Sequence, residues 1–218
     1  MGEPLSTLGE FVVAHGVMTA IDTEVDGFIA QATGEAKRLG KPQCNKCSVR
    51  KACCWSLVVA RLYEGIRVAA HLRAAHRDTP ELRDRLRAAA AAMEAADPYA
   101  WRQPCVFLDE QERCSVYAAR PTPCGTLWVY SPPAACNEPG APIRAFIAER
   151  EFAAATALEE PFRTRLGLRK KVGRRYLGVL PRMVLLALET WDREDFREVL
   201  SAHPWPTDAE VERWSRRG

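Results

Sequence analysis

The chain has 218 residues, 47% of them hydrophobic, and a formal net charge of +3. This length and apolar content suffice for one buried core, so the eight cysteines are not needed to staple a small fold. The near balance of acids and bases gives no general electrostatic attraction to nucleic acid. We find no signal-peptide pattern and no apolar run of the ~18 residues that a membrane span needs. These features predict a cytoplasmic protein with reduced cysteines.

Helical periodicity dominates the first hundred residues. Residues 5–40 predict a helix in two pieces. A second helix is expected to open at Cys53-Cys54 and to run to about Leu72, and a third covers 79–96 with Thr79 as N-cap. The charged residues of the second helix are expected to lie largely off its apolar stripe: Arg61, Glu64, Arg67 and Arg73.

The pattern changes after Trp101. Residues 105–117 read as a short β-hairpin around a polar turn, and the Pro-rich residues 131–142 as an irregular loop. Helices are expected again over 143–158, 176–191, 192–202 and 208–214. The sequence therefore predicts a mostly α fold in a single domain over 1–218. In this prediction, residues 44–136 form a metal-binding core, in which a small β-hairpin and irregular cysteine loops surround the metal site. Helices over 5–40 and 143–216 are expected to flank this core.

The cysteines carry the strongest chemical signal. All eight gather in the loops and their edges, and we take them as candidate metal ligands: Cys44, Cys47, Cys53, Cys54, Cys105, Cys114, Cys124 and Cys136. A Cys-x-x-Cys loop is a usual half-site for a tetrahedral ion. The same motif serves redox chemistry in a βαβ context, but here helices are expected on both sides of it. Cys136 fits a ligand and a buried apolar residue equally well.

The adjacent pair Cys53-Cys54 needs its own explanation. Neighbouring side chains on a helix diverge by about 100°, so the pair suits two ions, or two atoms of one cluster, better than one ion. A helix start would also lower the pKa of both thiols. Several nearby cations could offset thiolate charge or be ordinary surface residues: Lys46, Arg50, Lys51, Arg113 and Arg120.

The number of cysteines bears on which metal is bound. Four thiolates satisfy one zinc ion, whereas seven or eight suit two sites or a multinuclear cluster. All-cysteine ligation keeps both zinc and an iron–sulfur cluster open, and the adjacent pair favours the cluster. The histidines lie outside ligand-like spacing of any cysteine and are expected to pack or face solvent: His15, His71, His76 and His203.

The cysteine segments resemble a bacterial family called the putative zinc- or iron-chelating domain, of CxxCxxCC type. The matching residues are the group ending in Cys53-Cys54, the stretch Cys105-Val-Phe-Leu, and the stretch from Cys114 through Tyr117, Arg120 and Pro121 to Cys124. This chain departs from the pattern in two ways. Five residues separate Cys47 from Cys53, and Gly125 stands where an arginine is common.

The resemblance implies metal binding, and a more distant likeness to the cysteine domain of flagellin lysine methylases implies iron–sulfur binding and methyl transfer from S-adenosylmethionine. We therefore carry three hypotheses: a metal-binding protein with an iron–sulfur or zinc site, an iron–sulfur enzyme of methyl-transfer or redox type, and a zinc-braced protein-interaction module. Tyr117 and Arg120 are the polar residues expected to lie beside the metal or to line a pocket near it.

The expected partners follow from these hypotheses. They are metal ions and a protein partner or substrate, without a membrane. The basic run over 163–175 is expected to be a solvated helix face rather than a nucleic-acid contact, because few aromatic residues accompany it.

Overall fold

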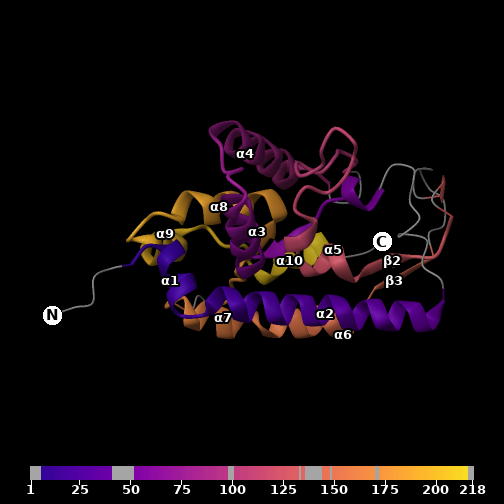
Figure 1. Cartoon of the computed structure of the whole chain (residues 1–218), viewed down its shortest axis with the longest axis horizontal. Coiled ribbons are helices and arrows are strands. Elements are labelled where there is room, and N and C mark those ends of the chain that lie inside the picture. Colours follow the sequence, from indigo (N-terminus) through magenta and orange to yellow (C-terminus); the bar gives the residue numbers. More distant parts are fainter. Residues whose placement is uncertain are drawn as a thin grey trace.

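The computed structural model describes residues 6–40, 52–97, 101–132, 134–135, 144–147, 149–169 and 172–215. Over these residues the protein is mostly helical, with two short pairs of antiparallel strands. Helix α4 (Pro80–Ala95) lies on one side, α2 (Val17–Leu39) lies on the other, and α3 (Leu62–Ala74) and α8 (Leu180–Thr190) lie between them (Figure 1). The mostly α fold expected from the sequence is confirmed.

The first helical stretch is divided as predicted. Helix α1 (Leu8–Ala14) begins with a capping box. The Thr7 hydroxyl accepts the backbone N–H of Glu10, and the Glu10 carboxylate accepts the backbone N–H of Thr7. Gly16 then takes a left-handed conformation, with φ of 62°, before α2 starts. The buried residues of α2 recur every three or four positions: Val17, Ile21, Val25, Ile29, Ala32 and Ala36.

The second helix starts later than the sequence suggests. Cys53-Cys54 lies in a four-residue 3₁₀ helix, Ala52–Trp55, and α3 begins only at Leu62. Between them the strand β1 (Val59–Arg61) pairs with β4 (Leu177–Val179). The expected helix start at Cys53-Cys54 is therefore wrong, and with it the argument that a helix dipole lowers the pKa of these thiols.

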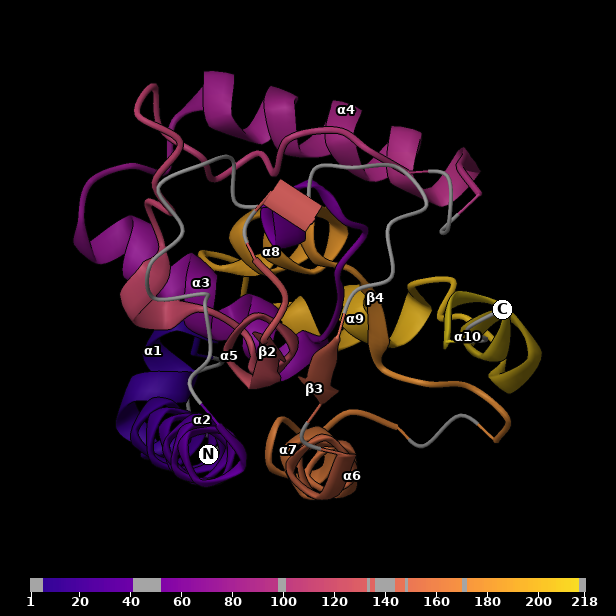
Figure 2. The same ribbon diagram turned by 90° about the vertical axis from the view of Figure 1, so that its right-hand side faces the viewer.

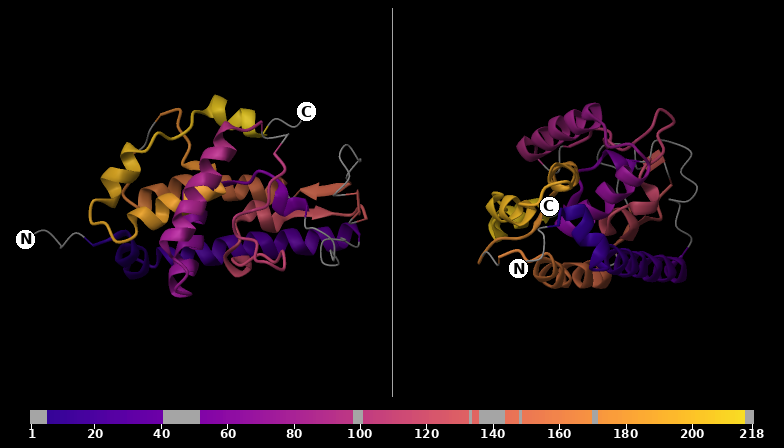
Figure 3. Two further views of the ribbon diagram at one scale, coloured as in Figure 1. Left: turned by 90° about the horizontal axis from the view of Figure 1, so that it is seen from above. Right: turned by 60° about the vertical axis from the view of Figure 1, so that its left-hand side comes forward.

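The pair α3 and α8 forms the centre of the core. Gly65 makes this close packing possible, since a Cβ atom there would lie 2.6 Å from the backbone carbonyl of Met183. Almost every residue of α8 is buried, because α3 covers one face and α4 another. Seen from above, α4 runs across the helices beneath it (Figure 3).

The C-terminal half contains more strand than predicted. Residues 145–147 form β3 (Ala145–Ile147), which pairs with β2 (Leu127–Val129), so the helix expected over 143–158 is reduced to α6 (Glu149–Ala157). The helix expected from residue 176 likewise starts at Leu180, after β4. Three-residue strands have no periodic signature of their own, and pairing partners distant in sequence decide them.

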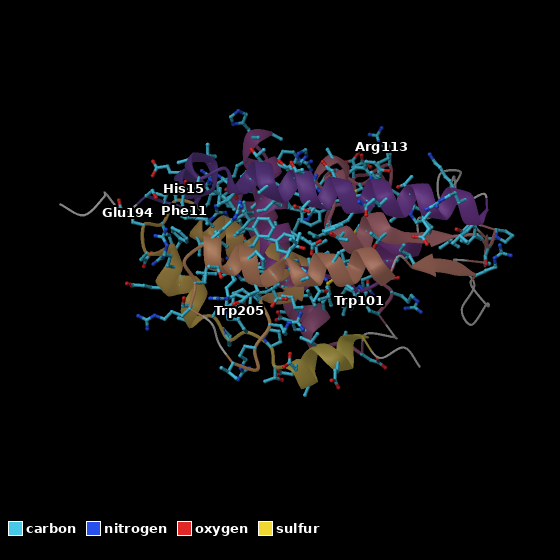
Figure 4. All side chains as sticks on the ribbon, turned by 90° about the horizontal axis from the view of Figure 1, so that it is seen from below. Phe11, His15, Trp101, Arg113, Glu194 and Trp205 are labelled. Carbon is cyan, nitrogen blue, oxygen red and sulfur yellow. The ribbon has the colours of Figure 1, made fainter. Side chains whose placement is uncertain are left out.

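The remaining helices close the molecule. Helix α7 (Glu159–Arg165) follows α6, and the two lie beside α2 (Figure 2). Helices α9 (Phe196–Ala202) and α10 (Asp208–Ser215) match the expected C-terminal helices within a few residues. Phe11 stacks on His15 at 4.2 Å between ring centroids, and Trp205 is buried and donates to the carbonyl of Leu200 (Figure 4).

Asp78 ties the end of α3 to α4. Its carboxylate accepts hydrogen bonds from Arg83 at 2.7 Å and from Arg73 at 2.9 Å, and the Arg83 hydrogen bond is the main reason that the pKa of Asp78 lies below its ordinary value. A carboxyl whose pKa is lowered by folding stabilises the folded state above its unfolded pKa. That contribution is lost as the pH falls through its folded pKa.

We predict that Asp78→Asn lowers the free energy of unfolding at neutral pH by about 1–3 kcal/mol, because the charged hydrogen bonds are lost. The gap to the wild type should close in acid, as the pH falls below the ordinary Asp value of 3.8. Urea unfolding at a series of pH values measures this. Asp84→Asn, in the exposed pair with Arg87, should change stability little. A gap for Asp78→Asn that is constant across the whole pH range would contradict the prediction.

Candidate metal centre

The structure describes the side chains of four of the eight candidate ligands. These are Cys54, Cys105, Cys114 and Cys124, and no disulfide joins them to one another. Only the backbone of Cys53 is described. The other three candidates, Cys44, Cys47 and Cys136, lie outside the described residues. The same holds for the cations Lys46, Arg50 and Lys51.

Cys54 and Cys105 belong to backbone segments that touch. The N–H of Cys105 donates to the carbonyl of Cys54 at 2.7 Å. The two segments are therefore neighbours although about fifty residues separate them in the sequence. This bond joins the first cysteine group to the second, as a shared metal site requires.

Cys114 lies across a tight turn from this contact. The carbonyl of Cys105 accepts the N–H of Leu108 at 3.0 Å, and Leu108 forms an antiparallel bridge with Cys114. Cys105 and Cys114 are both half-buried against the main core. The expected hairpin is present but shorter than predicted: Cys114 is bridged to Leu108, while the N–H of Cys105 is bound by Cys54.

The polar turn of this hairpin is organised by Asp109. Its carboxylate accepts the backbone N–H groups of Gln111 and Arg113, and it also pairs with the Arg113 guanidinium at 3.0 Å. The Arg113 side chain is 68% exposed and lies at the edge of the molecule (Figure 4). Arg113 is thus engaged in the turn, which makes it a poor candidate for offsetting thiolate charge.

Arg120 stands in a different position. Its guanidinium lies over the ring of Tyr117, with 4.0 Å from Cζ to the ring centroid. The Arg120 Nε is buried and has no hydrogen-bond partner among the described residues. The Tyr117 ring is 61% exposed. The two residues that the sequence singled out together therefore touch, and they lie seven and four positions before Cys124.

Cys124 sits in the short helix α5 (Thr122–Thr126) and is exposed. The next residue, Gly125, packs against α2, and a Cβ atom there would lie 2.4 Å from Cγ1 of Ile29. An arginine at this position would force α5 away from α2. The departure from the family pattern at Gly125 thus has a packing reason in this chain.

We predict that Gly125→Ala lowers the free energy of unfolding by about 1–3 kcal/mol, because the branched Ile29 side chain cannot easily move aside. Gly34→Ala on the α2 surface, where a Cβ atom meets nothing within 4 Å, is the matched control. It should stabilise by about 0.4–1 kcal/mol. Urea denaturation measures both, and equal effects of the two substitutions would contradict the packing argument.

Three charged residues at the start of α3 are buried, contrary to the expectation from the sequence. Arg61, Glu64 and Arg67 are almost fully buried, with 3%, 0% and 3% exposure, rather than lying off the apolar stripe. A charged residue within a helical run normally marks the solvent face. The sequence does contain one signal of their pairing. The three residues are spaced by three, so charges of opposite sign lie on the same face of neighbouring helical turns.

An open pocket of about 420 Å³ lies between the hairpin and the start of α4. Its lining combines arginines, acids and apolar side chains: Arg77, Arg85, Asp109, Glu110, Leu82 and Val106. Tyr117 and Arg120, expected to line a pocket near the metal, are not among the residues that line this one.

Part of the basic run over 163–175 is paired within the protein, and Lys170 and Lys171 lie outside the described residues. Only its first part is helical, because α7 ends at Arg165. Arg163 binds Glu160, while Arg175 binds Glu159 and lies 3.9 Å from Asp208. These carboxylates offset the charge of Arg163 and Arg175, which makes those two residues less available to a phosphate backbone.

Among the described side chains, no group of three or more His, Cys, Asp or Glu residues is placed to hold a metal ion. The described part of the site supplies thiols only, from two segments that a backbone bond joins. Thiolate donors fit zinc and iron–sulfur clusters, whereas Mg²⁺ and Ca²⁺ prefer oxygen ligands. The donor chemistry thus fits the predicted metals.

Residues 43–138 match the family model CxxCxxCC. The family is described as a putative zinc- or iron-chelating domain, and the resemblance predicted from the cysteine spacing is confirmed. The CxxCxxCC match includes every cysteine of the chain and ends before α6. No curated protein and no solved structure matches the chain. The likeness to flagellin lysine methylases therefore stays a prediction.

No helix in the described part of the chain combines the length and apolar character needed to cross a membrane.

Proposed function

We propose that this protein holds a metal centre through cysteine thiolates drawn from both cysteine segments. The observation that carries the proposal is the 2.7 Å bond from the Cys105 N–H to the Cys54 carbonyl, which brings the two halves of the CxxCxxCC segment together. The candidate ligands are Cys44, Cys47, Cys53, Cys54, Cys105, Cys114, Cys124 and Cys136. We place the protein in the cytoplasm, where thiols stay reduced.

We favour an iron–sulfur cluster over a single zinc ion, since one zinc ion uses only four of eight cysteines and the adjacent pair suits ligation of different atoms. When bound, such a cluster supplies one-electron chemistry, whereas zinc supplies a cross-link. Arg120 is the described cation best placed to offset thiolate charge, because it has no carboxylate partner among the described residues.

An enzyme of methyl-transfer or redox type is the second candidate. The pocket of about 420 Å³ beside the hairpin favours it, because its lining includes Val106 and Ser115, the sequence neighbours of two proposed ligands. Product formation with S-adenosylmethionine, assayed on anaerobically purified protein, separates this candidate from a protein-interaction module.

We predict that Cys54→Ser and Cys114→Ser lower the metal content and the thermal midpoint together, because a metal that joins two distant segments contributes to folding. Elemental analysis of protein purified without oxygen, with its visible spectrum, measures the first effect and identifies the metal. Thermal unfolding measures the second.

Ser115→Ala is the matched control for instability alone. It removes the 2.7 Å hydrogen bond from Ser115 to the Phe107 carbonyl in the same hairpin, at a cost of about 0.5–1.5 kcal/mol, without removing a thiol. Its metal content should equal that of the wild type. Wild-type metal content in both cysteine variants would refute the proposed centre.

A further inference from the structure

Two buried charged residues of α3 hold the loop that leads to Cys124. Glu64 is 0% exposed and Arg67 is 3% exposed, and their spacing of three places them on one face of the helix. Both side chains bind backbone groups of the loop rather than a side chain of it. The loop is defined here as residues 118–122, which run from a 3₁₀ helix, Tyr117–Ala119, to the first residue of α5, and only Pro123 separates it from Cys124.

Arg67 binds the part of the loop before Pro121. Its Nη1 donates to the carbonyl of Arg120 at 3.1 Å, and its Nη2 donates to the carbonyl of Ala118 at 3.3 Å. The positive charge is balanced from α2, where Asp22 lies 2.8 Å from Nε and Asp26 lies 2.6 Å from Nη2. One guanidinium thus joins α2, α3 and the loop.

Glu64 binds the part of the loop after Pro121. Its Oε1 accepts the N–H of Thr122 at 2.6 Å, at the start of the helix that contains Cys124. Its Oε2 accepts the N–H of Arg61 at 2.8 Å and lies 3.4 Å from the Arg61 Nη1. The carboxylate therefore has partners on both oxygens, as a fully buried charge requires.

The two contacts are complementary in sign. A cation binds carbonyl groups on one side of Pro121, and an anion binds an N–H group on the other side. Pro121 has a restricted φ and no N–H of its own. The backbone that leads to Cys124 is therefore held in one conformation from both sides.

Stability alone gives a weak reason for this arrangement. Burying charges costs desolvation energy, and well-packed apolar residues of similar size often stabilise a core as well or better. Paired buried charges are better suited to holding one geometry, and in metal sites such outer contacts orient the ligands.

We propose that Arg67 and Glu64 are positioning residues of the metal centre, which act by setting the place of the Cys124 thiolate. This inference rests on the proposed function. Loss of either side chain should misplace one ligand and weaken metal binding, without removing any thiol.

The experiment compares metal affinity in Arg67→Lys, Arg67→Met and Glu64→Gln with the wild type, by competition with a chelator at a temperature where every variant is folded. Loss of an outer contact typically lowers metal affinity by about 10–100-fold. Lysine keeps the charge but cannot reach two carbonyls and two carboxylates at once, so Arg67→Lys should show the effect even if Arg67→Met does not fold.

Arg73→Met is the matched control. Arg73 lies on the same helix and pairs with Asp78 and Asp192, which are not part of the loop. This substitution should lower the thermal midpoint but keep wild-type metal affinity. An equal loss of affinity in Arg73→Met and Arg67→Lys would mean that both act through general stability, and would overturn the inference.

The double variant Arg67→Lys with Cys124→Ser tests the route through Cys124. If Arg67 acts by placing that thiolate, the Arg67→Lys substitution should add no further loss once Cys124 is serine, whereas independent effects would add. Additive losses overturn the inference and leave the proposed function intact. Absence of metal from the wild type overturns both.

Discussion

The proposed metal centre depends on one backbone hydrogen bond, from the N–H of Cys105 to the carbonyl of Cys54. It joins a 3₁₀ helix at the end of the first cysteine group to the hairpin that opens the second. Each of the two segments is also held by contacts with the rest of the protein. The hairpin packs Phe107 and Val116 into the main core, while β1 follows the 3₁₀ helix into a ladder with β4.

Around this contact, the helices form a frame that fixes the loops. Gly65 lets α3 approach α8, and Gly125 lets α5 approach α2, so small residues stand where two elements must be close. The buried charges of α3 then bind the backbone of the loop directly. A frame of this kind gives irregular loops one conformation, which sulfur ligands on loops need if they are to meet at one ion.

Local patterns were sufficient for part of this structure. Periodicity and capping residues predict two helical pieces before residue 40, the capped start of α4 at Thr79 and the position of the hairpin, but they did not locate the break at Gly16. The strands β1 to β4 were missed because each is three residues long and pairs with a distant segment. The burial of Arg67 was missed because its partners on α2 and in the loop lie more than forty residues away. For the site, spacing identified the thiols and the metals that suit them, but the contact between Cys54 and Cys105 needs the fold.

X-ray absorption at the zinc and iron edges, on protein purified without oxygen, tests the central claim most directly. The account predicts sulfur as the only neighbouring atom type contributed by the chain, at about 2.3 Å if the metal is zinc. Substitution of Cys54 by serine and substitution of Cys105 by serine should each change the X-ray absorption spectrum of the same metal. A shell of nitrogen and oxygen neighbours that neither substitution alters would contradict the claim that the two segments share one centre.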